Sequence, residues 1–312
     1  MAQTDLTQGI ITFFQEDYLS IWIESFLIDR KAQNLSEGTL QFYRKKLKLF
    51  SHFCDSQAIT QITQITPNTL RQFLFYLGET NHNPGGVHAF YRAIRAFLKW
   101  WEQETEPDDW RNPIDKVKAP RVAIESLEPV DLGDVSKLLK SCTGDSFTDI
   151  RDRAVILFLL DTGVRANELI SIDISDIRLS AGSVLIRVTK NKKTRTVYMG
   201  KKCRKAVRDY LKGIPANPRG GAWLSRGYTR LGYDGLRAII TRRSRLAGVP
   251  PPQLHSFRRA FAINMLRAGV DIYSLQELMG HSSLQMLQRY LKLVNSDLRI
   301  AHAIGSPVDR LL

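Results

Sequence analysis

Hydrophobic residues recur at helical spacing through the N-terminal third of the chain. The spacing predicts four helices, over residues 13–33, 37–53, 66–77 and 86–101. Ser36 and Thr66 stand where a side chain would cap the second and third of them, and Pro67 suits the first turn of the third. Four amphipathic helices joined by short connections predict a compact helical bundle.

The C-terminal part of the chain has a different pattern. Residues 151–164 are strongly apolar, which is typical of a helix that is buried on all sides. Residues 184–199 predict a short β-hairpin, while 256–269 and 272–279 have the spacing of amphipathic helices that each end at a glycine. We expect this part to be mainly α with a small antiparallel β-sheet.

A segment that suits neither helix nor strand separates the two parts. Pro113, Pro120 and Pro129 interrupt both patterns, which predicts an extended linker. With 312 residues, 43% of them hydrophobic, the chain can bury a core in each of two domains. The predicted division is a helical domain over 1–118, a linker over 119–130 and a second domain over 131–312, with a tail from about residue 293.

Composition gives no support to membrane or secretory classes. The chain has no run of about 18 apolar residues, and its N-terminus lacks the basic and apolar regions of a secretion signal. Cys54, Cys142 and Cys203 are far apart, which is typical of reduced thiols rather than of a disulfide or metal framework. We expect a cytoplasmic protein without a metal or other cofactor.

Positive charge is concentrated in the second part of the chain. The formal net charge is +14, and residues 1–121 contribute none of it, because 14 basic residues there balance 14 acidic ones. Between Arg187 and Lys212, eleven basic residues accompany a single acid. Lysine and arginine contacts to phosphates supply most non-specific affinity for DNA. We therefore expect a polyanionic partner, and double-stranded DNA fits this requirement.

Basic residues also form local stripes on the predicted helices. One stripe lies on the second helix and one on the fourth, and further clusters lie in the hairpin and in TRRSR. Segregated charge suits a surface that touches DNA on one side, although each single side chain fits an ordinary solvated helix face nearly as well. The candidate DNA contacts are Arg44, Lys45, Lys48, Arg92, Arg95, Lys99, Lys192, Lys193, Arg242 and Arg243.

Two short motifs in the second domain contain candidate catalytic residues. TGVRANEL places Arg165 after a Thr-Gly turn and Glu168 one helical turn later. TKNKKTR places Lys190 near the tip of the predicted hairpin.

The stretch over 254–292 carries the remaining candidates. His255 and Arg258 begin one helix and lie on one face of it. His281 opens a further helix, which leucines at helical spacing attach to a core. This spacing leaves Tyr290 at the edge of the buried stripe, where its phenol can face a groove.

Together these groups suit one reaction, the attack of a tyrosine hydroxyl on a phosphodiester. Two guanidiniums hold the non-bridging oxygens and offset the charge that grows in the transition state. A lysine beside two arginines has reason to have a lowered pKa and can protonate the leaving 5′ oxygen, while a histidine accepts the tyrosine proton. This chemistry requires no metal.

The motifs TGVRANEL, TKNKKTR, HSFRR and GHSS, followed by the tyrosine, resemble those of the tyrosine recombinases, the phage-integrase family, over nearly the whole chain. The resemblance implies a role for each candidate: Tyr290 the nucleophile, Arg165 and Arg258 the phosphate clamps, Lys190 the general acid, His255 the acid/base partner, His281 the second histidine and Glu168 the acidic brace. The helical bundle resembles the SAM-like core-binding domain of the family, and the second domain resembles its catalytic domain.

Two positions depart from the family pattern. Met286 and Leu287 stand where two threonines are often found, which bears on the packing of the tyrosine helix rather than on the chemistry. TKNKKTR lacks the glycines often found beside the lysine, so Lys192 or Lys193 remains an alternative to Lys190 as the acid.

The resemblance implies a site-specific DNA recombinase with a simple, Xer-like two-domain layout. It would act in integration, excision or dimer resolution through a 3′-phosphotyrosine intermediate, and the freed 5′-hydroxyl would then exchange strands without ATP. The resemblance also implies a homotetramer on two DNA sites, with the tail docked on a neighbouring protomer or folded back on its own domain. Two alternatives remain: a type IB topoisomerase-like enzyme, and a non-catalytic DNA-binding or architectural protein.

Overall fold

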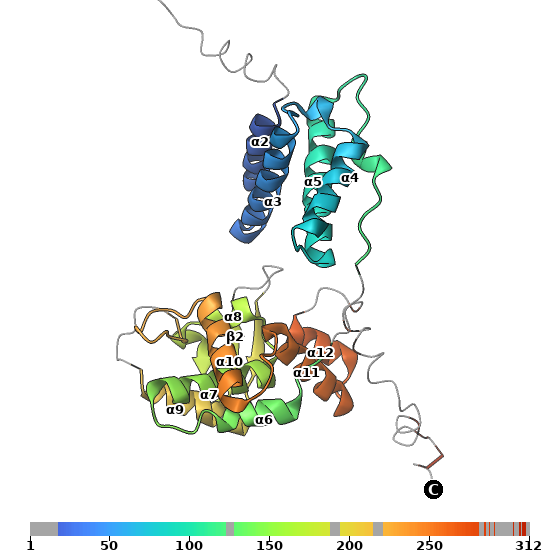
Figure 1. The fold of residues 1–312 in the computed structure, drawn as a ribbon. Helices are drawn as coiled ribbons and strands as arrows, with labels where there is room; N and C mark the ends of the chain where they lie inside the picture. Colours follow the sequence, from blue (N-terminus) through green and yellow to red (C-terminus); the bar gives the residue numbers. More distant parts are fainter. Residues whose placement is uncertain are drawn as a thin grey trace, which may run out of the picture. The chain divides into compact units, whose positions relative to one another are not determined.

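The chain folds into two units that divide between residues 125 and 126, within the predicted linker segment. Figure 1 colours the first unit blue to teal and the second green to red. The computed structural model describes residues 18–122, 128–187, 194–214 and 221–280, together with Leu284, Leu287, Tyr290, His302, Ser306, Val308 and Asp309. The predicted fold class is confirmed, since the described residues form helices and one small antiparallel sheet.

The N-terminal unit contains the four predicted helices. They are α2 (Leu19–Ala32), α3 (Glu37–Ser56), α4 (Pro67–Glu79) and α5 (Pro84–Thr105), with two short 3-10 turns, η1 (Ile62–Gln64) and η2 (Pro113–Lys116). The predicted caps are present, because Ser36 Oγ accepts the amide of Thr39 at 3.3 Å and Thr66 Oγ1 accepts that of Thr69 at 3.1 Å. Residues 13–17 of the first predicted helix lie outside the described part.

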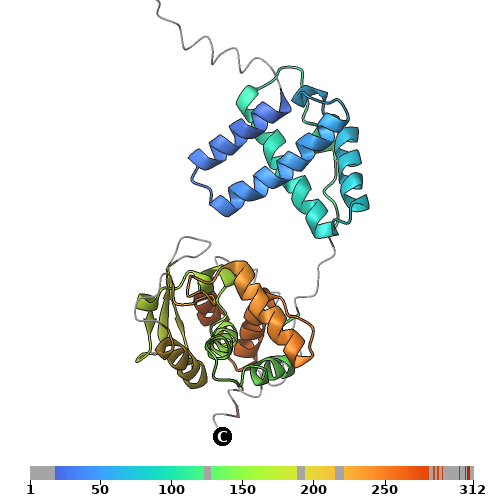
Figure 2. The ribbon, with the colours of Figure 1, turned by 60° about the vertical axis from the view of Figure 1, so that its left-hand side comes forward.

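Helix α5 is the centre of this unit and contacts the other three helices (Figure 2). Its aromatic side chains fill the space between them, and Phe97 packs edge to face on Phe26 of α2 with ring centroids 5.7 Å apart. Tyr91 donates its hydroxyl to the carbonyl of Val117 at 3.0 Å, which attaches the segment after α5 to the bundle.

The C-terminal unit contains a three-stranded antiparallel sheet and seven helices among its described residues. In chain order the elements are α6 (Leu132–Lys140), α7 (Phe147–Thr162), α8 (Ala166–Ile170), η3 (Ile174–Asp176), β1 (Ile177–Arg178), β2 (Ser183–Ile186), β3 (Arg195–Tyr198), α9 (Lys201–Lys212), α10 (Tyr233–Ala247), α11 (Leu254–Arg267) and α12 (Ile272–Met279). The predicted hairpin is β2 paired with β3, with Ile186 opposite Arg195. Strand β1 was not predicted, because two residues are too short for a periodic signal.

Helix α7 forms the core of this unit, as its apolar sequence predicted. Ala154, Val155 and Phe158 are fully buried, and α7 contacts α6, α9, α11 and β3. The helix ends at Gly163, which has a left-handed φ of 60°. A Cβ at Gly163 would lie 2.3 Å from Phe261 Cδ1, so both the turn and its packing on α11 require glycine.

Two further observations concern the cysteines and the predicted absence of a membrane span. Cys54, Cys142 and Cys203 are all buried and unpaired. Within the described residues, no helix is both long and apolar enough to cross a membrane.

Candidate active site

Arg165 and Glu168 are joined in one turn directly after α7. Gly163 turns the chain, and Arg165 then precedes α8, with Glu168 in the first turn of that helix. Glu168 Oε2 accepts the backbone amide of Arg165 at 2.8 Å, and Oε1 accepts Arg165 Nη1 at 2.8 Å. The Arg165 side chain stays 25% exposed, whereas that of Glu168 is 2% exposed. Glu168 therefore orients the arginine from inside the protein.

Arg195 shares the same carboxylate, although it was not among the site residues predicted from the sequence. Its Nη1 and Nη2 donate to Glu168 Oε1 and Oε2 at 2.9 and 2.8 Å. Burial alone would raise the pKa of Glu168, but the hydrogen bonds and charges of Arg195 and Arg165 outweigh it and lower this pKa to about 2. The only signal in the sequence was the position of Arg195 at the end of the basic TKNKKTR motif.

Arg258 connects three of the sequence motifs through backbone carbonyls. It lies on α11 and is 1% exposed. Its Nη1 donates to the carbonyl of Gly163 at 2.7 Å, and its Nη2 donates to that of Met279 at 2.6 Å. Burial, followed by the charge of Arg165, lowers the pKa of Arg258 to about 9, so its guanidinium stays protonated at neutral pH.

His255 begins the same helix and is exposed. Partial burial of the ring, and then the charges of Arg258, Arg259 and Arg165, lower its pKa. The imidazole is therefore neutral at pH 7 and able to accept a proton. It borders a hollow of about 340 Å³ that is also lined by Tyr233 and Arg237 of α10.

Tyr290 lies deeper than its spacing predicted. We expected it at the edge of the buried stripe, but it is only 2% exposed. It belongs to a cluster with Phe261 and Leu275, which lie on α11 and α12, and with Leu287. The phenol also interacts electrostatically with Arg258. The additional burial follows from the apolar faces of α11 and α12, which the local sequence around Tyr290 does not show.

Four of the predicted residues lie outside the described part of the chain. Lys190, Lys192 and Lys193 belong to the connection between β2 and β3, and His281 directly follows the left-handed Gly280 that caps α12. Their predicted roles remain predictions.

The candidate DNA contacts of the N-terminal unit differ in their exposure and in whether acidic side chains already bind them. The side chains of Arg44, Lys45, Lys48, Arg92 and Arg95 are exposed. Lys99 is half-buried, and its ammonium donates to Glu102 at 2.9 Å and to Asp115 at 3.0 Å. These two hydrogen bonds raise the pKa of Lys99 and engage it within the unit.

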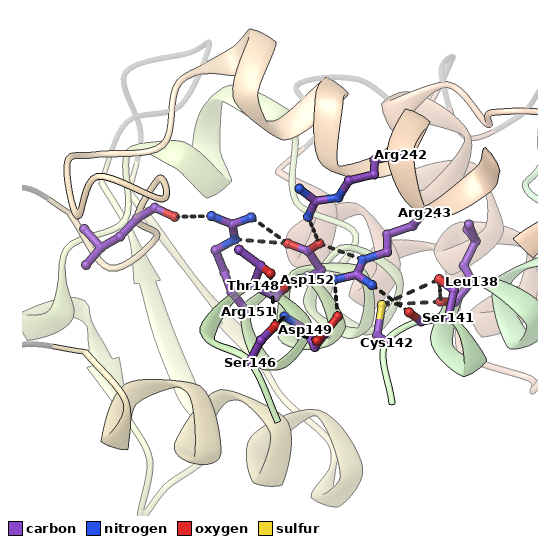
Figure 3. A network of polar contacts seen from close by, with 11 residues as sticks. Leu138, Ser141, Cys142, Ser146, Thr148, Asp149, Arg151, Asp152, Arg242 and Arg243 are labelled. Atoms are coloured by element: carbon purple, nitrogen blue, oxygen red, sulfur yellow. Dashed lines mark hydrogen bonds and ion pairs between the residues drawn. The ribbon is translucent and has the colours of Figure 1, made fainter. Parts of the chain in front are cut away.

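Arg242 and Arg243 of α10 are engaged inside the C-terminal unit (Figure 3). Arg243 is 3% exposed, and its Nε donates to Asp152 at 2.7 Å while Nη1 and Nη2 donate to Ser141 O and Asp149. Arg242 donates to the same Asp152, but it is only partly buried. We therefore leave Arg243 out of the DNA contacts, because all three of its nitrogens are used within the protein.

Arg165, Arg258 and His255 thus come from α11 and the turn before α8 and lie close enough for their charges to interact. The partly exposed guanidinium of Arg165 beside a neutral imidazole suits the binding of a phosphate and the transfer of a proton from a nucleophile. In the part of the chain that the structure describes, no group of three His, Cys, Asp or Glu residues could hold a metal ion.

Comparison with protein families matches both units. Residues 130–296 match the model of the phage integrase family, and residues 23–105 match that of its N-terminal SAM-like domain. A tyrosine recombinase XerC of Oceanobacillus iheyensis is 28% identical over 309 residues, which cover 94% of this chain and 96% of the relative. A tyrosine recombinase XerA of Saccharolobus solfataricus is 32% identical over 213 residues, which cover 68% of this chain and 65% of the relative.

Solved structures share the fold. The XerH site-specific recombinase bound to a palindromic difH substrate aligns with a TM-score of 0.68 at 19% identity, over 92% of this chain and 84% of that one. A lambda integrase tetramer bound to a Holliday junction aligns with a TM-score of 0.73 at 15% identity, over 93% and 81%.

Proposed function

Because the chain belongs to the phage integrase family and is a tyrosine recombinase, we propose that Tyr290 is the nucleophile with which it cuts DNA. The relatives support site-specific recombination and give no support to the topoisomerase-like or architectural alternatives. One observation carries the assignment of the site. Arg258 hydrogen-bonds Gly163 and Met279, so it joins the segment before Arg165 to the end of α12, two residues before His281.

The proposed cleavage step conserves bonds and charge. The Tyr290 oxygen attacks the scissile phosphorus while His255 takes its proton, and the bond from phosphorus to the 5′ oxygen breaks. Arg165 and Arg258 bind the non-bridging oxygens and stabilise the charge of the transition state. Lys190, or Lys192 or Lys193 in its place, protonates the leaving 5′ oxygen, and His281 hydrogen-bonds the phosphate.

Strand exchange is the reverse chemistry with another strand. A 5′-hydroxyl attacks the 3′-phosphotyrosine and gives its proton back to the lysine that acted as the acid, while the bond to Tyr290 breaks and the phenol recovers its proton from His255. Because one phosphodiester is formed for each one broken, the reaction consumes no ATP.

Cleavage requires both the Tyr290 phenol and the Arg258 guanidinium to become accessible to DNA, because these residues are 2% and 1% exposed and both Nη atoms of Arg258 donate to backbone carbonyls. We infer that DNA binding shifts the segment that carries Tyr290 and thereby exposes both groups. The phenol already interacts electrostatically with Arg258, one of the two proposed phosphate clamps.

The proposed partner is double-stranded DNA, bound by four protomers on two sites. The XerH and lambda integrase structures contain DNA, and the latter is a tetramer on a Holliday junction. Exposed arginines and lysines of α3 and α5 supply phosphate contacts, as do Lys192 and Lys193 in the hairpin. The tail from about residue 293 docks on a neighbouring protomer, or folds back on its own domain. With DNA as its substrate, the protein would act in the cytoplasm, at the nucleoid of a prokaryotic cell.

A nicked suicide substrate tests the nucleophile. DNA that the protein binds is first selected from random sequence, and a nick beside the cleavage position then traps the covalent adduct. The unchanged protein should form an adduct that survives denaturation, and Tyr290→Phe should form none. Tyr273→Phe on the exposed face of α12 is the matched control and should keep the adduct.

Three different outcomes separate the recombinase from the two alternatives. Cleavage at one position of the selected DNA, with transfer to a second strand, supports a recombinase. Relaxation of supercoiled plasmids that lack the selected site would instead indicate the topoisomerase-like enzyme. Binding of the selected DNA without any adduct would indicate an architectural protein.

A further inference from the structure

Arg195 occupies a junction between three motifs of the proposed active site. It is the first residue of β3 and directly follows the connection that carries Lys190. Its guanidinium donates to both oxygens of Glu168, at 2.9 and 2.8 Å, and its Nε donates to the carbonyl of Leu278 at 3.0 Å. The side chain is 9% exposed, so the guanidinium faces the protein rather than solvent.

The contact of Arg195 with α12 extends to the turn before His281. Leu278 lies in the last turn of α12, and Gly280 caps that helix in a left-handed conformation with φ 62°. A Cβ at Gly280 would lie 2.9 Å from Arg195 Cδ and 3.1 Å from Nη1. The aliphatic stem of the arginine therefore packs directly on this turn, and glycine is needed there both for the backbone and for the contact.

The contact of Arg195 with Glu168 extends to Arg165. Oε1 of Glu168 accepts Nη1 of both arginines, so their positions depend on each other through one carboxylate. Without Arg195, Glu168 keeps its bonds to Arg165 but loses the pair of donors that fixes the plane of its carboxylate. Arg165 would then be oriented by a carboxylate that only Arg165 itself holds in place.

We propose that Arg195 is a positioning residue for strand cleavage, which holds the Arg165–Glu168 pair and the Gly280 turn in one arrangement with the hairpin that carries Lys190. This inference rests on the proposed function of Tyr290 and Arg165. Arg195 itself needs no contact with DNA. Its effect is on the rate of cleavage rather than on binding.

Arg151 provides a matched comparison within the same unit. It is also buried, donates Nε and Nη2 to one carboxylate, that of Asp152, at 3.0 and 2.8 Å, and donates Nη1 to the carbonyl of Leu224 at 3.0 Å. These partners include none of the proposed active-site residues (Figure 3). A purely structural role would make substitutions at Arg151 and Arg195 equivalent.

The test compares methionine and lysine variants at both positions on the nicked suicide substrate at saturating DNA. Both methionine variants should lower the melting temperature, and both should bind DNA as the unchanged protein does. Only Arg195→Met should slow adduct formation per folded molecule, on the order of 100-fold. Arg195→Lys keeps the charge but cannot reach all three acceptors, and should lose about tenfold. The lysine variants keep the comparison valid if a methionine variant does not fold.

The pH dependence adds a measurement that a change in stability would not affect. Arg195 is the main partner that lowers the pKa of Glu168 against its burial. In Arg195→Met this pKa rises, so the carboxyl begins to protonate and to release Arg165 as the pH falls. The ratio of the unchanged protein's rate to that of Arg195→Met should therefore grow from about pH 7 to about pH 5, and the ratio for Arg151→Met should stay constant.

Two outcomes separate this inference from the proposed function. If the unchanged protein forms no adduct, the proposed function fails. If it forms one, and Arg195→Met cleaves as fast as Arg151→Met over the whole pH range, Arg195 is only a structural ion pair and the inference is overturned.

Discussion

Glu168 is the carboxylate on which the predicted phosphate clamp depends, and Glu168→Gln tests this directly. The carboxylate is 2% exposed and accepts hydrogen bonds from Arg165 and Arg195. Glutamine has nearly the same shape, but it removes the negative charge and directs an amide N–H group towards one of the guanidiniums. The variant therefore leaves two arginines close together without their counter-ion.

The magnitude follows from the pKa of the carboxyl group. This pKa is about 2 in the folded protein instead of 4.5. Since one pKa unit corresponds to about 1.4 kcal/mol, the interactions of the ionised form stabilise the fold by about 3 kcal/mol. The loss on breaking a buried ion pair, about 3–5 kcal/mol, is similar. In a unit of this size the melting temperature should fall by about 6–12 °C.

Urea unfolding of both proteins as a function of pH provides the assay. A lowered pKa stabilises the fold above the unfolded value and ceases to do so as the pH falls towards the folded value. The difference in free energy of unfolding between the two proteins should thus be about 3 kcal/mol at pH 7 and shrink between about pH 5 and pH 2. Other carboxylates titrate in both proteins and cancel in the difference.

Asp209→Asn is the control for this experiment. Asp209 pairs with Lys205 on the exposed face of α9 at 2.9 Å, and its loss should cost about 0.5 kcal/mol or less. A difference for Glu168→Gln as small as this, or one that does not change down to pH 3, would refute the assignment of Glu168 as the buried counter-ion of both arginines.

Two further predictions concern charged residues outside the site. Asp152→Asn removes the buried carboxylate that Arg151, Arg242 and Arg243 share. In urea titrations it should lower the free energy of unfolding of the C-terminal unit by about 3–5 kcal/mol, and a loss below about 1 kcal/mol would contradict this network. Arg92→Gln should reduce the slope of log binding constant against log salt concentration by about one counterion. Lys99→Gln should reduce this slope less, because Glu102 and Asp115 already neutralise Lys99. Equal slopes for the two variants would show that these ion pairs open on DNA.

The helices were largely predictable, because the signals that set them are local. Ser36 and Thr66 cap the helices that they were expected to cap, and Gly280 ends α12 in the left-handed conformation. Helix α7 was predicted as buried because its apolar residues cover every face. Strand β1 was missed, since its pairing partner rather than its own sequence makes it a strand.

The order of the chemical groups along the chain was determined by the sequence alone. Arg165, Glu168, His255 and Arg258 were identified from motifs of a few residues, and their spacing on helices is also local. Tertiary contacts, however, bring these residues together. One example is the hydrogen bond from Arg258 to the Gly163 carbonyl, which joins residues 95 positions apart.

Only the tertiary structure decided which charged and polar groups are buried. Arg243 lies in a basic run that suggested a DNA contact, yet its nitrogens bind Asp152 and Asp149 from another helix. In the sequence Arg195 resembles the lysines before it, but in the structure it donates hydrogen bonds to Glu168, which lies 27 residues away. Tyr290 is buried by α11 and α12 rather than by its own neighbours in sequence. A charged or phenolic side chain becomes buried when distant parts of the chain supply its partners, and local periodicity contains no information about them.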